Sequence, residues 1–119
     1  MMLKRAWQHF WDKYMKSPVE EIDVSDFPMD EIVRYRIVFS GLVQGVGFRY
    51  ETWTIAQKLD LVGFVENLTN GDVYAEIQGP KNKILYLIEC MKSIPRIQIE
   101  KLQMDEIEIK DEKEFEITN

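Results

Sequence analysis

The sequence is poor in the side chains that most metal and nucleophilic sites require. Of its 119 residues, one is cysteine, Cys90, and one is histidine, His9. A Ser-His-Asp or Cys-His site needs a histidine beside its nucleophile, and His9 precedes the domain that we expect to fold. No His or Cys residues have the spacing of a zinc site, so we expect no metal. The Gly-x-x-x-x-Gly-Lys-Ser/Thr and Gly-x-Gly-x-x-Gly nucleotide-binding patterns are also missing.

Other absences bear on the compartment and on the partners. A single cysteine cannot form an intramolecular disulfide, which favours a reducing compartment. No apolar run approaches the ~20 residues needed to span a bilayer, and Lys4 and Arg5 are not followed by the apolar stretch of a signal peptide. We therefore expect a cytoplasmic protein. The net charge of −6 argues against a nucleic-acid partner.

Charge divides the chain near residue 32. Residues 1–16 have a net charge of +3, whereas residues 17–32 contain six acidic residues, no basic residue and two prolines. The second stretch is typical of an extended linker. We therefore predict an N-terminal extension over residues 1–32 and one compact domain over residues 33–119.

The extension begins with an amphipathic pattern. Five apolar or aromatic residues fall on one face of a helix, and basic residues occupy other faces: Leu3, Trp7, Phe10, Trp11 and Tyr14. One interpretation is a helix that docks on its own domain or on a second copy of the chain. A second is a surface helix for an anionic membrane or for a groove on a protein partner. A disordered tail is the third.

Hydrophobic periods predict the elements of the domain. Residues alternate as in a strand over 33–40, 62–66 and 73–78, with a hairpin turn at Asn70-Gly71. Helical spacing covers 48–59 and, with a stop at Pro95, 84–91. A long strand over 97–109 changes phase, which indicates a β-bulge or a bend, and a short strand covers 115–117. This order predicts an α+β, ferredoxin-like β-α-β-β-α-β sandwich, with two helices on one face of an antiparallel sheet.

The junction between the first strand and the first helix is the most informative segment. Residues 40–49 read Ser-Gly-Leu-Val-Gln-Gly-Val-Gly-Phe-Arg. Glycines at this position allow successive backbone N–H groups to face an anion, and the helix dipole favours negative charge there. Arg49 adds a charged fork that matches phosphate oxygens. The segment therefore predicts a phosphate site.

The same residues resemble a known family. The runs over residues 41–49 and 63–73, with one helix between them, are very similar to the two signature motifs of the acylphosphatases, and the resemblance covers about residues 33–119. It implies hydrolysis of an acyl phosphate to a carboxylate and inorganic phosphate, without metal or cofactor. The alternative is an acylphosphatase-like domain with little turnover that binds an anion or a protein partner.

The resemblance also implies roles for individual residues. Arg49 matches the arginine that binds the phosphoryl group, and Asn67 matches the asparagine that orients the attacking water. The backbone N–H groups of five residues match the loop that holds the phosphoryl oxygens: Gln44, Gly45, Val46, Gly47 and Phe48. The chain departs from the usual pattern at Leu42, where many members are basic or polar, and at Phe64, where tryptophan is frequent.

Three residues outside the motifs complete the expectations. Cys90 is predicted to be a small core or half-buried residue of the second helix, with no redox role. Arg34 and Arg36 point outward from the first strand. We expect them either to form a solvated face or to pair with carboxylates.

Overall fold

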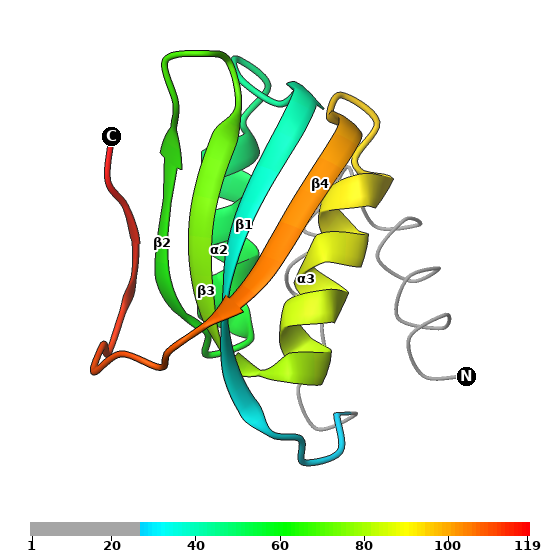
Figure 1. The fold of residues 1–119 in the computed structure, drawn as a ribbon. Coiled ribbons are helices and arrows are strands. Elements are labelled where there is room, and N and C mark those ends of the chain that lie inside the picture. The colour runs from blue at the N-terminus through cyan, green and yellow to red at the C-terminus, as the bar shows by residue number, and fades with distance from the viewer. Residues whose placement is uncertain (1–26) are drawn as a thin grey trace.

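The computed structural model describes residues 27–119, which fold into a five-stranded sheet and two helices (Figure 1). The amphipathic pattern over residues 1–16 lies outside these residues. Among residues 27–119, no helix is long and apolar enough to cross a membrane. The elements are β1 (Ile32–Leu42), α2 (Phe48–Lys58), β2 (Val62–Asn67), β3 (Val73–Pro80), α3 (Lys81–Ser93), β4 (Gln98–Ile107) and β5 (Phe115–Ile117).

The strands lie in the order β4-β1-β3-β2-β5. The first four are antiparallel to their neighbours, as predicted, but β5 pairs in parallel with β2. The reason is topological. Strand β4 ends where β2 begins, so the chain that crosses to the free edge of β2 must run in the same direction as β2. The sheet is therefore mixed rather than wholly antiparallel.

The hydrophobic core lies between the sheet and the two helices, which cover one face of the sheet (Figure 1). Alternate residues of β1 and β3 enter it, and Ile37 and Ile77 are completely buried. From the helices, Ile55 and Leu87 are also completely buried. Cys90 is buried in the same core, as predicted, and burial raises the pKa of its thiol to about 12.

The predicted bulge lies in β4. Ser40 of β1 pairs with Lys101, but the next residue, Gly41, pairs with Ile99. Glu100 is the extra residue on β4, and it causes the change of phase in the sequence. Gly41 fits this close approach because a Cβ atom there would overlap the backbone of β4.

Arg34 and Arg36 both pair with carboxylates, which was one of the two expected arrangements, but they differ in burial. Arg36 is half exposed and lies 3.4 Å from Asp105, as a solvated residue would. Arg34 is instead completely buried. The segment that connects β4 to β5 covers it, and Glu112 in this segment pairs with Arg34 at 2.6 Å. A period of two residues shows which face a side chain is on, but not what a distant segment places over that face.

Within residues 27–119, two further side chains contact the buried guanidinium of Arg34. Its Nε donates to Oε1 of Glu76 at 2.9 Å, and its Nη1 donates to Oε1 of Gln78 at 3.0 Å. Gln78 and Lys110 also exchange hydrogen bonds through the backbone of Lys110. This network attaches the β4–β5 connection to the sheet, and β5 follows directly from it.

Candidate active site

The topology brings the two sequence motifs to one end of the sheet. Strands β1, β2 and β5 all end there, and β4 begins there. The glycine loop, residues 44–48, follows β1 and leads into α2. Asn67 is the last residue of β2, and Asn119 follows β5. The residues that we predicted to act together therefore share one edge of the fold.

The glycine loop has the geometry of an anion site. Gly45 and Gly47 adopt positive φ angles of 75° and 79°, which a residue with a Cβ atom adopts only under strain. Gly47 also precedes α2 directly as its N-cap. Among the described residues, no hydrogen-bond acceptor faces the backbone N–H groups of residues 44–47. Of the predicted loop residues, Gly45, Gly47 and Phe48 line the cavity described next, whereas Gln44 and Val46 do not. The N–H groups of the two glycines and the first turn of α2 are therefore the donors that suit an anion.

Arg49 projects from the first turn of α2 into a cavity of about 370 Å³. Its Nη1 donates a hydrogen bond to Oδ1 of Asn119 at 3.2 Å. Among the described residues that line this cavity, Arg49 is the only charged one: Val43, Gly45, Gly47, Phe48, Arg49, Tyr50, Asn67, Ile117 and Asn119. The single charged side chain in this described lining is a cation, which favours an anion, and the cavity volume is sufficient for a phosphoryl group.

Asn67 lines the same cavity and is held by its backbone. Its N–H donates to Oδ1 of Asn119 and its carbonyl accepts from Nδ2 of Asn119, both at 2.9 Å. Its own side-chain oxygen, Oδ1, is buried and has no hydrogen-bond partner among the described residues. In this geometry a water in the cavity cannot reach the buried Oδ1, so Asn67 can orient a water through this oxygen only after its side-chain amide rotates toward the cavity.

Gln44 contributes more than a backbone N–H group. Its side-chain Nε2 donates to the carbonyls of Leu68 and Asp72, each at 2.8 Å. These two carbonyls belong to the turn between β2 and β3, which follows Asn67. The Gln44 side chain therefore connects the two motifs directly, a contact that sequence spacing alone did not reveal.

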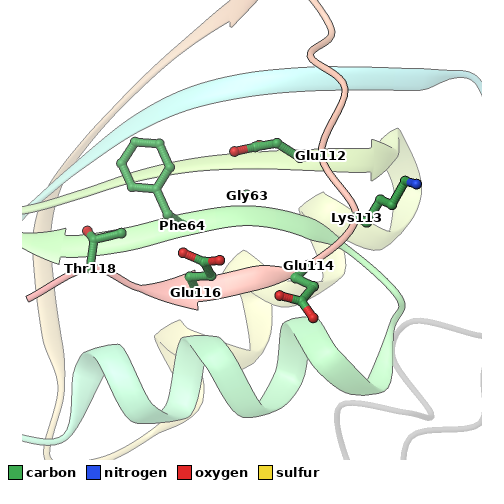
Figure 2. Close-up of a pocket in the computed structure, with 7 residues that line it drawn as sticks. All are labelled: Gly63, Phe64, Glu112, Lys113, Glu114, Glu116 and Thr118. Atoms are coloured by element: carbon green, nitrogen blue, oxygen red, sulfur yellow. The ribbon is translucent and has the colours of Figure 1, made fainter.

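A second, larger cleft of about 450 Å³ lies beside β5 (Figure 2). Figure 2 shows Phe64 and Thr118 on one part of its wall and charged side chains on the other. Three of these are carboxylates and one is an amine: Glu112, Glu114, Glu116 and Lys113. A negative wall repels phosphate, so the cavity of Arg49 is the better site for an acyl phosphate.

Comparison with known proteins identifies the family. The acylphosphatase family model matches residues 35–117. An acylphosphatase of Acaryochloris marina is 41% identical over 90 residues, which cover 75% of this chain and 97% of that protein. The chain belongs to the acylphosphatase family.

Solved acylphosphatases have the same fold. That of Bacillus subtilis is 32% identical, with a TM-score of 0.69 over 75% of this chain and 100% of its own. That of Coxiella burnetii is 31% identical, with a TM-score of 0.67 over 72% of this chain and 92% of its own. The predicted family and the predicted ferredoxin-like fold are thereby confirmed.

Within this acylphosphatase fold, two residues next to the site escaped the sequence analysis. Arg96 lies two residues before β4 begins, and its Nε donates to the carbonyl of Val46 at 2.7 Å. Its Nη2 lies 2.5 Å from Oε2 of Glu51, a half-buried carboxylate of the first turn of α2. Burial raises the pKa of Glu51. Only the register of β4 against β1 places Arg96 beside the loop, and no sequence motif marks that register.

Asn119 is the third residue that sequence reasoning missed. It is part of neither motif, and it reaches the site because β5 runs parallel to β2. Among residues 27–119, no group of three His, Cys, Asp or Glu side chains is placed to hold a metal ion.

Proposed function

We propose that this acylphosphatase hydrolyses the carboxyl-phosphate bond of small acyl phosphates, and that Arg49, Asn67 and the glycine loop perform the reaction in a cytoplasmic setting. One observation supports the proposal above all. The cavity that holds Arg49 is also lined by Gly45, Gly47 and Asn67, and no acceptor within residues 27–119 pairs with the N–H groups of the two glycines. Phosphoryl transfer needs this combination of donors around the phosphorus and an oriented water.

The phosphoryl group would enter with its oxygens against the glycine loop. The loop N–H groups, the first turn of α2 and the fork of Arg49 would then share the negative charge of its oxygens. Because that charge spreads over three equatorial oxygens during transfer, fixed donors stabilise the transition state more than the ground state.

Asn67 would hold the attacking water. With its side-chain amide rotated toward the cavity, its Oδ1 would accept one hydrogen bond from this water, and its Nδ2 would donate to the water or to a phosphoryl oxygen. The water oxygen attacks phosphorus as the bond to the carboxylate oxygen breaks, so the products are a carboxylate and inorganic phosphate. A carboxylate is a good leaving group, and the reaction needs no strong general base.

Phosphate release from benzoyl phosphate tests the proposal. We expect turnover by the wild-type protein and a large loss in Arg49→Ala, with full activity in Arg36→Ala as the control for removal of an arginine. Arg49→Lys keeps the charge but loses the fork, and we expect it to remain well below wild type. A wild-type protein without turnover would favour the catalytically weak binding domain instead.

A further inference from the structure

We propose that Arg96 is a positioning residue that sets the orientation of the Val46–Gly47 peptide, so that the Gly47 N–H points at the phosphoryl group. The inference rests on the proposed function of the glycine loop. It adds a residue outside both motifs and assigns it a specific structural task.

The Val46–Gly47 peptide bond is trans. The described chain contains no cis peptide, so the carbonyl of Val46 and the N–H of Gly47 point in opposite directions from one plane. Arg96 fixes the carbonyl end of this peptide plane, because its Nε donates a hydrogen bond to the Val46 oxygen at 2.7 Å. The N–H at the other end then points away from Arg96.

The alternative orientation of the peptide would damage the site. Gly47 has φ 79° and ψ 18°, and glycine passes between backbone regions with little steric hindrance. If the peptide flipped, the Val46 carbonyl would take the place of the Gly47 N–H. A carbonyl oxygen there would repel a phosphoryl oxygen, and one donor would be lost. A loop with two glycines therefore needs an external contact that selects one orientation.

Arg96 is itself held in place. Its Nη2 pairs with Oε2 of Glu51, and the backbone N–H of Glu51 donates to the carbonyl of Gly47 at 3.0 Å. Arg96 thus links the Val46 carbonyl to Glu51 in the first turn of α2. Gly47, whose peptide orientation matters, lies between these two contacts. A Cβ atom on Gly47 would lie 3.2 Å from Nη2 of Arg96, which shows how closely the guanidinium packs on this peptide.

Arg96 differs from Arg49 in its position relative to the cavity proposed to bind the phosphoryl group. Its guanidinium binds the Val46 carbonyl of the loop, and Arg96 is absent from the described residues that line the cavity of Arg49. We therefore assign it no contact with the substrate. Its effect passes through the Gly47 donor, and a change at Arg96 should weaken phosphate binding and turnover together.

The test measures inorganic phosphate binding by the full chain, observed at the amide resonance of Gly47. In the wild-type protein, phosphate should shift the Gly47 N–H resonance downfield. In Arg96→Met, which keeps length but no donor, we expect this shift to shrink and the phosphate Kd to rise about tenfold. In Arg96→Lys, which retains one donor and the charge, we expect an intermediate Kd. Turnover of benzoyl phosphate should fall by about 10- to 100-fold in Arg96→Met. This decrease is no larger than the one expected when an oxyanion donor is removed completely.

Lys92→Gln is the matched control, since it removes an exposed cation from the end of α3 without touching the loop. A Gly47 shift and a phosphate Kd in Arg96→Met equal to those of the wild type would overturn the inference. So would a Lys92→Gln effect as large as that of Arg96→Met, because net charge would then explain both. Phosphate binding through Gly47 without turnover would instead refute the proposed function and leave the role of Arg96 standing.

Discussion

The Arg49 guanidinium donates a hydrogen bond to the side-chain oxygen of Asn119 at 3.2 Å. The same oxygen accepts the backbone N–H of Asn67 at 2.9 Å. One amide therefore holds the residue proposed to bind phosphate beside the residue proposed to orient water. It also fixes the distance between two motifs that lie on different elements of the fold.

Removal of the Asn119 side-chain amide should make the Arg49 side chain more mobile without unfolding the domain. In Asn119→Ala we expect kcat/KM to fall by about tenfold, the size of one hydrogen bond to a charged group. Asn119→Asp keeps the acceptor but places a negative charge in the cavity, so it should raise KM more than Asn119→Ala does. Steady-state kinetics with benzoyl phosphate decide the matter, and equal KM values in the two variants would contradict this view of the cavity.

Gln44 should matter for both stability and activity. Gln44→Ala loses two hydrogen bonds to the turn after β2, so we expect the free energy of unfolding to fall by about 1–3 kcal/mol. The two motifs would also lose their direct connection, and turnover should fall with stability. Urea unfolding measures the first effect. Gln57→Ala, on the exposed side of α2, is the control. If Gln57→Ala lowered the free energy of unfolding as much as Gln44→Ala does, the hydrogen bonds of Gln44 would not explain the loss.

The buried ion pair of Arg34 offers a comparison within one strand. Arg34→Met leaves the carboxylates of Glu76 and Glu112 without their buried partner, and we expect a loss of about 3–5 kcal/mol in the free energy of unfolding. Arg36→Met breaks only the exposed pair with Asp105, which should change stability by about 1 kcal/mol or less. Thermal or urea unfolding of the two variants measures the difference. Equal decreases in the free energy of unfolding would show that the buried pairs of Arg34 stabilise the protein no more than the exposed pair of Arg36.

The raised pKa of Tyr74 predicts how the free energy of unfolding changes at alkaline pH. Burial, then the hydrogen bond and the negative charge of Glu76, raise the pKa of Tyr74 from its ordinary value of 10 to about 12. Glu66 raises this pKa further and Arg36 opposes the shift. A pKa raised in the folded state stabilises the protein below about pH 10, and this contribution disappears as the pH rises toward 12.

Wild-type stability should therefore fall more steeply between about pH 10 and pH 12 than that of Tyr74→Phe, which has no phenol to ionise. Unfolding experiments across this range measure the slope. Glu76→Gln should bring the phenol pKa closer to its ordinary value, observed by ultraviolet absorbance. Parallel stability curves for wild type and Tyr74→Phe would show that Tyr74 does not contribute.

The sequence predicted the order of the elements and the position of the bulge, because alternation and helical spacing are local properties. It also placed Arg49 and Asn67 at the ends of the right elements. It could not predict the burial of Arg34, because the segment that covers it comes from the β4–β5 connection. Asn119 and Arg96 escaped for a related reason. Each reaches the site through the pairing of strands far apart in the chain, which no local pattern encodes.

Turnover of benzoyl phosphate by Asn67→Ala tests the central claim most directly. Phosphate release is measured beside the wild type and beside Asn70→Ala, which changes an amide of the neighbouring turn and should remain active. We expect kcat of Asn67→Ala to fall by at least ~100-fold, as for the loss of one transition-state donor, at an unchanged melting temperature. A folded Asn67→Ala protein with the turnover of the wild type would contradict the account.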